Sequence, residues 1–274
     1  MNVALGQYYP SGSVLHRLDP RMKFILAIVY IVAGFLCKNV ISFAWLFVST
    51  VILVLLSKIP MRIVLKSIKA IIFIIVFTAI INIFLTKGEE NQLLFSWKFI
   101  AIYENGLYNA LFIIVRILAM IVGTSIFLTY TTTPIQLTDA IERLFSPLKV
   151  LHVPVHEFAM MMTIALRFIP TIVEETQKIM AAQKARGTDF SNGPLAKRIK
   201  ALIPIIIPLF VSAFRRAGDL ATAMTCRCYR GGEGRTRMTV LKLSYRDFIA
   251  LATMIILIGG IVVINILSIG YTMN

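Results

Sequence analysis

Long apolar runs separated by short polar segments dominate both ends of the chain. The runs cover residues 24–37, 40–56, 70–85, 105–130 and 248–269, and the last contains no charged residue. A helix needs about 20 mainly apolar residues to cross a bilayer, and each run with its flanks reaches that length. The pattern therefore predicts five transmembrane helices.

The polar segments between these runs differ in charge, which predicts their sides of the membrane. Residues 58–69 carry four basic residues and no acid, whereas residues 86–104 hold three glutamates against two lysines. Residues 131–246 contain 17 of the 28 basic residues but only 8 acids. Cytoplasmic segments are enriched in Lys and Arg. We therefore expect the N-terminus and residues 131–246 to be cytoplasmic and residues 86–104 to be external.

Residues 131–246 read as helices rather than as a loop. Thr133 and Pro134 suit a helix start, since threonine caps and proline fits the first turn. An amphipathic helix ending near Ser146 follows, and its apolar stripe is Leu137, Ala140, Ile141, Leu144, Phe145 and Leu148. We expect this stripe to lie at the membrane surface or against a membrane partner.

Two long helices are predicted next, over residues 155–186 and about 195–230. Each begins apolar and becomes amphipathic before it ends at an arginine. Pro170 is expected to bend the first helix. In the second, a stripe of mostly small residues predicts close packing against another helix; it comprises Ala213, Ala217, Leu220, Ala221 and Met224. The predicted regions are thus a four-span membrane region (1–130), a cytoplasmic helical region (131–246) and a final span (247–274).

Composition supports an all-α polytopic membrane protein. The chain has 274 residues, 58% of them hydrophobic and 15% charged, with a mean hydropathy of +0.83. A net charge of +15 would suggest nucleic acid in a soluble protein, but here it fits cytoplasmic segments next to a membrane. The three cysteines show no paired framework, which favours a reduced setting.

No catalytic, metal or cofactor site is predicted. His152 and His156 are four residues apart, but Pro154 lies between them and no third ligand is evident. Cys226 and Cys228 lack further ligands in the same way. The string Y-R-G-G-E-G-R-T-R from Tyr229 lacks the Gly-Lys-Ser/Thr of a P-loop, so the chain should not hydrolyse ATP by itself.

Arg116 interrupts the fourth apolar run. A charge at that depth is costly, so the side chain should face the protein interior or a polar cavity, or it should extend to the membrane surface from an offset helix. The sequence leaves both interpretations open.

Arg186 and Arg227 stand where the two long helices should end. Gly187 can supply the left-handed residue after a helix, and a cation suits the last turn, so capping alone explains Arg186. Arginine is also suited to bidentate pairing with a partner's carboxylate. The presence of two such ends favours docking as well as capping.

Three motifs together resemble the transmembrane T component (EcfT) of energy-coupling factor transporters, ABC importers for vitamins and trace metals. They are H-R-L-D-P-R-M-K (residues 16–23), Ala185-Arg186-Gly187, and R-C-Y-R-G-G-E-G-R-T (residues 227–236). The resemblance covers most of the chain and places it in a bacterial plasma membrane.

The resemblance implies two cytosolic ATPase subunits and a separate substrate-binding membrane protein, the S component, as partners. Two crossed coupling helices would carry ATP-driven motion between them through arginine tips that dock on the ATPases. The implied docking residues are Ala185, Arg186, Gly187, Arg227, Tyr229, Arg230 and Gly231. Cys226 and Cys228 depart from the family's alanine and glycine, so the resemblance does not extend to how the second helix ends.

The main alternative is an ordinary ABC permease subunit with its own substrate path. The spans argue against it, because Arg116 and Asn82 are almost their only strongly polar side chains. A lipid-modifying enzyme would need clustered carboxylates or histidines, and a nucleic-acid tether would need basic residues along one open face.

Overall fold

The computed structural model describes residues 8–85, 93–97, 100–188, 194–231, 241 and 243–267. These residues divide into two compact units. One holds residues 6–140 and 241–274, and the other holds residues 141–240 with residues 1–5. Within the described residues, one boundary between the units falls inside a helix, α5.

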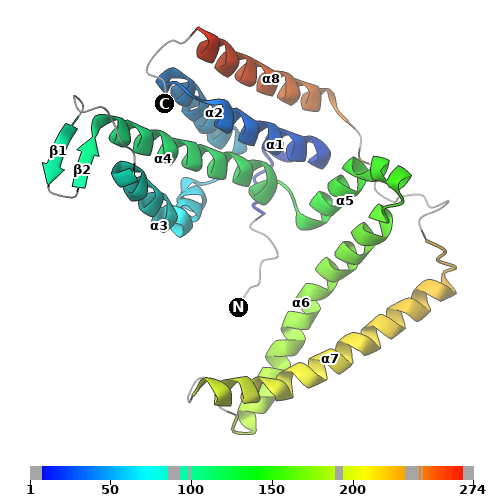
Figure 1. Cartoon of the computed structure of the whole chain (residues 1–274). Helices are drawn as coiled ribbons and strands as arrows, with labels where there is room; N and C mark the ends of the chain where they lie inside the picture. The colour runs from blue at the N-terminus through cyan, green and yellow to red at the C-terminus, as the bar shows by residue number, and fades with distance from the viewer. Residues whose placement is uncertain are drawn as a thin grey trace. The chain divides into compact units, whose positions relative to one another are not determined.

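The larger unit is a bundle of apolar helices (Figure 1). Its helices are α1 (Pro20–Leu36), α2 (Val40–Ser57), α3 (Met61–Leu85), α4 (Glu104–Thr124) and α8 (Tyr245–Ile266). The helix α4 continues as a π-helical segment, η3 (Ser125–Tyr130), and a short 3₁₀ turn, η1 (Leu15–Arg17), precedes α1. A two-stranded antiparallel hairpin, β1 (Leu93–Trp97) with β2 (Ile100–Tyr103), joins α3 to α4.

The smaller unit contains the long helices. The helix α5 (Pro134–Leu144) leads through the 3₁₀ segment η4 (Ser146–Leu151) into α6 (Val155–Ala185), and α7 (Leu195–Cys226) follows. The bounds predicted from the sequence for these helices are confirmed to within a few residues.

Local capping explains several of these starts. Asp19 caps α1 by accepting a hydrogen bond from the Arg21 backbone N–H at 2.9 Å. Thr133 and Gln136 cap α5 reciprocally, each side chain accepting from the other's backbone N–H. Both caps appear in the sequence as short polar residues beside a proline, which is why these boundaries were predictable.

The core of the larger unit forms around Tyr30, which is fully buried. Its hydroxyl hydrogen-bonds with Thr50 Oγ1 at 2.5 Å, which joins α1 to α2. Its ring lies directly on α4 at Gly123, where an added Cβ would be only 2.2 Å from a ring carbon. A glycine is therefore required at this helix contact.

Within the described residues, six helices are long and apolar enough to cross a membrane. They include α2, α3, α4 with η3, and α8, together with α6 and α7. The all-α polytopic fold is confirmed, with the hairpin as a small addition. The count differs from five because α6 and α7 also qualify, and α1, with 17 residues, is not among the six.

Two further details differ from the sequence predictions. The third helix begins at Met61 rather than near residue 70. The basic residues before residue 70 belong to the same continuous helix, where Arg62, Lys66 and Lys69 lie exposed. The side chains of the predicted external segment, including Trp97 and Tyr103, lie outside the described residues, as does the end of the last predicted run beyond Leu267.

Arg116 faces the bundle interior. Its guanidinium donates a hydrogen bond to the Cys37 carbonyl at 2.8 Å, where α1 ends, and lies 5.1 Å from the centre of the Phe43 ring. A cation is favourable at a helix C-terminus. These contacts fit the first interpretation, in which the Arg116 side chain faces the protein interior.

Candidate functional site

The candidate site consists of the ends of α6 and α7, which share one backbone geometry. At the first end, the Gly187 N–H bonds to the Lys184 carbonyl at 2.9 Å, and the Thr188 N–H bonds to the Gln183 carbonyl at 3.0 Å. These two bonds define a Schellman motif, which satisfies carbonyls at a helix C-terminus. Arg186 is the C-cap residue, and Gly187 has φ 86°.

The second end repeats these bonds residue for residue. The Cys228 N–H bonds to the Thr225 carbonyl at 2.9 Å, and the Tyr229 N–H bonds to the Met224 carbonyl at 3.1 Å. Arg227 is again the C-cap residue. Cys228 takes the glycine's place with φ 55°, a conformation that ordinary L-residues adopt at a cost of about 1–2 kcal/mol. The second helix therefore ends like the first despite its missing glycine.

Both arginines are available to a partner. Arg186 and Arg227 are exposed, as are Ala185, Gly187 and Arg230. In the part of the chain that the structure describes, neither Arg186 nor Arg227 forms an ion pair or a side-chain hydrogen bond. An exposed guanidinium at either end can donate to a carboxylate of a partner.

The surroundings of Arg227 include a groove of about 600 Å³. Met160, Thr163 and Ile164 of α6 form one side of it. The end of α7 forms the other, with Leu220, Met224, Arg227, Cys228, Tyr229, Arg230 and Gly231. This lining holds two guanidinium groups and no carboxylate, so it favours a partner that carries negative charge.

All of the predicted docking residues are described, and they lie in two groups, one at the end of α6 and one at the end of α7. Tyr229, Arg230 and Gly231 gather with Arg227 at the second end, and Gly231 has φ 92°. The second end lies beside residues 160–164 of α6, which precede Arg186 by about 22 or more residues. Because an α-helix rises about 1.5 Å per residue, Arg186 and Arg227 are on the order of 35 Å apart along the axis of α6. Residues 232–236, which complete the second motif, lie outside the described residues.

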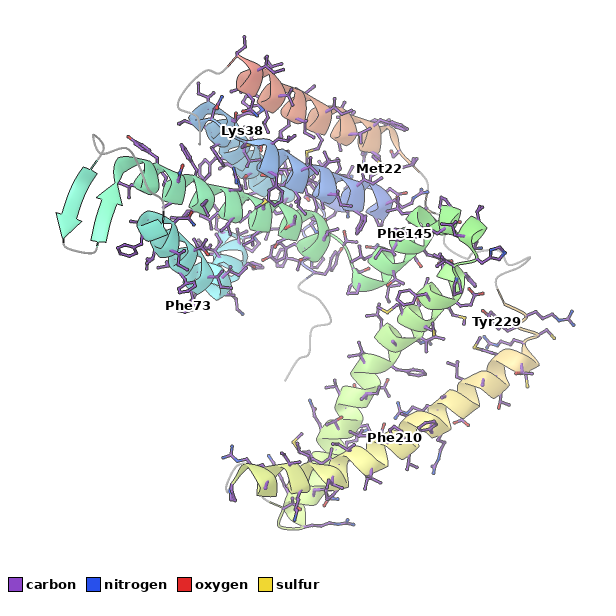
Figure 2. The ribbon with its side chains drawn as sticks, viewed as in Figure 1. Met22, Lys38, Phe73, Phe145, Phe210 and Tyr229 are labelled. Carbon is purple, nitrogen blue, oxygen red and sulfur yellow. The ribbon has the colours of Figure 1, made fainter. Side chains whose placement is uncertain are left out.

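The helices α6 and α7 cross between these two ends (Figure 1). Apolar residues from both helices enclose a groove of about 450 Å³ there; they include Phe168, Ile172, Leu209, Phe210, Ala213, Ala217 and Leu220. In Figure 2, Phe210 lies on α7 beside this groove, and Tyr229 lies just beyond the end of α7. Ala213 and Ala217 of the small-residue stripe border this groove but are exposed, so close packing through the stripe stays a prediction.

An ion pair between α6 and α7 was missed by the sequence analysis. Arg216 Nη2 donates to Glu175 Oε2, and both residues border the apolar groove. Their separation of 41 residues in the chain explains why no local pattern revealed the pair.

The two histidines do not form a metal site with each other. His156 Nδ1 lies 2.8 Å from Glu142 Oε1, which joins α6 to α5, and His152 is exposed at the end of η4 with φ 59°. Across the described residues, no three metal-ligating side chains come together.

Comparison with known proteins now places the chain in a family. Residues 11–238 match the CbiQ family, described as cobalt transport proteins. The chain is also 49% identical to an energy-coupling factor transporter transmembrane protein EcfT of Clostridium kluyveri, over 94% of both chains. The chain belongs to the EcfT family.

Other members are almost as similar. The EcfT protein of Ruminiclostridium cellulolyticum is 49% identical over 96% of this chain and 94% of its own. That of Bacillus subtilis is 45% identical over 93% and 96% respectively. These relatives are named as transmembrane components of a transporter rather than as enzymes, and the resemblance inferred from the three motifs is confirmed.

Proposed function

We propose that this EcfT-family chain couples ATP hydrolysis by two cytosolic ATPase subunits to substrate uptake through a separate S component. The proposal rests mainly on the two identical helix ends that present Arg186 and Arg227 to solvent. Two equivalent tips suit two similar subunits, each offering a carboxylate to one guanidinium. Vitamins or trace metals are the substrate class that the family resemblance suggests.

The proposed topology places α6 and α7 on the cytoplasmic side, although both are apolar enough to span a membrane. Residues 131–246 hold 17 of the chain's 28 basic residues, which the positive-inside rule assigns to the cytoplasm. Their exposed apolar faces would then lie against the S component and the membrane surface. The N-terminus would also be cytoplasmic.

In the proposed mechanism, movement of the ATPase subunits is transmitted through the helices α6 and α7. When ATP binding closes the ATPase dimer, the two docked tips move with their subunits, and the crossing of α6 and α7 changes as a result. A change at the crossing alters the apolar surface offered to the S component. Such a change can drive transport only to the extent that the S component binds the two arrangements with different affinities.

Charge reversal at the tips tests the proposal. Arg186→Glu and Arg227→Glu should each weaken co-purification of the ATPases in mild detergent, and the double variant should abolish it. Lys178→Glu and Arg215→Glu are matched controls, since both are exposed cations of the same helices away from the tips. Retention of both ATPases by the double variant would refute the docking role.

A further inference from the structure

We propose that the first turn of α1 anchors the two chain segments that connect the larger unit with the coupling helices, α6 and α7. The anchoring residues are Arg21 and Lys23, which belong to the motif H-R-L-D-P-R-M-K (residues 16–23). They lie on either side of Met22, which Figure 2 labels on α1. This inference rests on the proposed function, because it assigns both cations a positioning role in the transmission of movement.

The exit segment, residues 131–133, leads from η3 into α5 and is held by Lys23. Lys23 Nζ donates a hydrogen bond to the Thr131 carbonyl at 2.7 Å and another to the His16 carbonyl at 3.1 Å. The last carbonyls of a helix lack donors within the helix and carry partial negative charge, which favours a cation. Lys23 therefore fixes the end of η3 relative to α1 just before the chain enters α5.

Lys23 is buried, with an exposed fraction of 1%. It lies near the carboxylates of Asp19 and Asp247, which attract its charge. Burial of an ammonium group costs free energy unless the group is paired and hydrogen-bonded. Replacement of buried charged groups by apolar residues of similar volume is often neutral or stabilising. The carbonyls that Lys23 joins therefore point to a role in fixing the geometry of this region rather than in stability alone.

The return segment, which consists of Leu241, Leu243 and Ser244, precedes α8 and is held by Arg21. Arg21 Nη2 donates to the Leu241 carbonyl at 3.3 Å. The same guanidinium is paired with Asp19, since its Nη2 donates to Oδ2 at 2.8 Å and its Nε donates to Oδ1 at 3.1 Å. A bidentate arginine–carboxylate pair has a specific geometry, so Asp19 orients the guanidinium toward the return segment.

A second contact joins the return segment to the start of α1. The Asp247 carboxylate, in the first turn of α8, accepts from the Ser244 N–H at 2.7 Å and from the Asp19 N–H at 2.8 Å. Asp19 and Asp247 are both buried, and a hydrogen bond in a low-dielectric interior is electrostatically stronger than in water. The return segment is therefore linked to the start of α1 at both Leu241 and Ser244.

The order of elements along the chain determines what these contacts can do. The helices α5, α6 and α7 all lie between the exit segment and the return segment. The covalent path from Arg186 or Arg227 to the helices of the larger unit therefore runs through one of these two segments. With both segments held on α1, a pull at a docked tip rearranges the coupling helices. With either segment released, part of the movement is lost where the chain joins the larger unit.

The test measures, by double electron–electron resonance, whether each segment stays fixed relative to α1. One pair of spin labels, at Phe35→Cys and Ile135→Cys, reports on the exit segment. A second pair, at Phe35→Cys and Leu243→Cys, reports on the return segment. All three labelled positions are exposed.

The exposed Cys226 and Cys228 are replaced by serine for labelling, and the buried Cys37 is retained. Distances are recorded for the chain alone, and for the complex with both ATPases and the S component, with and without a non-hydrolysable ATP analogue. The variants Lys23→Met and Arg21→Met are compared with the parent, and thermal unfolding midpoints are measured for each.

We expect narrow distance distributions in the parent, which the nucleotide does not change. Lys23→Met should broaden the distribution of the exit pair and make it shift with nucleotide, whereas Arg21→Met should have these effects on the return pair. Arg17→Met is the matched control, because Arg17 is an exposed cation of the same motif. It should behave like the parent for both label pairs.

Parent-like distributions in Lys23→Met or in Arg21→Met would overturn the anchoring role. A lower unfolding midpoint without a nucleotide-dependent shift would also overturn it, because a purely structural role gives that result. Arg21 is partly exposed, so Arg21→Met tests the proposal even if Lys23→Met fails to fold.

Failure of the proposed function gives a different result. If the ATPases do not co-purify with the parent chain, the docking proposal fails. The broadening expected in the chain alone still tests whether Arg21 and Lys23 hold the two segments.

Discussion

Gly187 and Cys228 occupy the same position at the ends of α6 and α7, one residue after a C-cap arginine, and both are left-handed, with φ 86° and 55°. Only one of them is a glycine. The shared hydrogen bonds of the two ends therefore hold Cys228 in a conformation that its side chain disfavours.

Separate substitutions at Cys228 and Gly187 should change the free energy of unfolding in opposite directions. Cys228→Gly should raise the free energy of unfolding by about 1 kcal/mol, and Gly187→Ala should lower it by a similar amount, because a Cβ is disfavoured at this φ. An added Cβ at Gly187 meets no atom within 4 Å, so the effect isolates the backbone. Thermal unfolding and amide exchange at Thr188 and Tyr229 measure it. Stabilisation by Gly187→Ala would contradict the left-handed backbone conformation at residue 187.

Removal of the Arg116 guanidinium should destabilise the bundle. Arg116→Met leaves the Cys37 carbonyl without this donor, which we expect to cost about 1–3 kcal/mol. Lys38→Met is the matched control, since Lys38 is exposed beside the same turn between α1 and α2. Thermal unfolding in detergent should show a lower midpoint for the first variant only. Equal midpoints would indicate that Arg116 contributes no more than an exposed lysine.

A methyl group at Gly123 should disrupt the contact between α1 and α4. Gly123→Ala would place a Cβ 2.2 Å from the Tyr30 ring, and overpacking of this kind costs about 1–3 kcal/mol. Gly259→Ala in α8 serves as the control, because nothing lies within 4 Å of its added Cβ. We expect a lower unfolding midpoint at Gly123 and an unchanged or higher one at Gly259. An unchanged unfolding midpoint for Gly123→Ala would contradict the close contact between Gly123 and the Tyr30 ring.

Asp247 should be required at the junction of α1 and α8. Its buried carboxylate accepts from the Ser244 N–H at 2.7 Å and from the Asp19 N–H at 2.8 Å. Asp247→Ala removes both acceptors, and we expect a loss of about 2–4 kcal/mol because each unsatisfied buried donor costs about 1–3 kcal/mol. Asp219→Ala, at an exposed position of α7, should have little effect. Thermal unfolding compares the stabilities of the Asp247→Ala and Asp219→Ala variants. Equal losses of stability in the two variants would refute the structural role of Asp247.

The helices and their arginine ends could be predicted from the amino-acid sequence. Apolar runs reveal spans because the bilayer sets their length, and the starts of α1 and α5 were readable because caps act within three residues. The same signals are ambiguous in α6 and α7, whose apolar halves resemble spans in composition. They also gave the start of the third helix near residue 70, because the basic residues that follow Met61 interrupt the apolar run.

Which distant residues contact one another could not be predicted from the sequence and required the folded structure. The contact of Arg116 with Cys37 joins residues 79 positions apart, and the pair of Glu175 with Arg216 joins residues 41 apart. The left-handed Cys228 likewise depends on its backbone hydrogen bonds, since cysteine has no preference for that φ. Hydrophobicity and capping are local properties that a sequence displays directly, whereas these contacts depend on how packed helices bring distant side chains together.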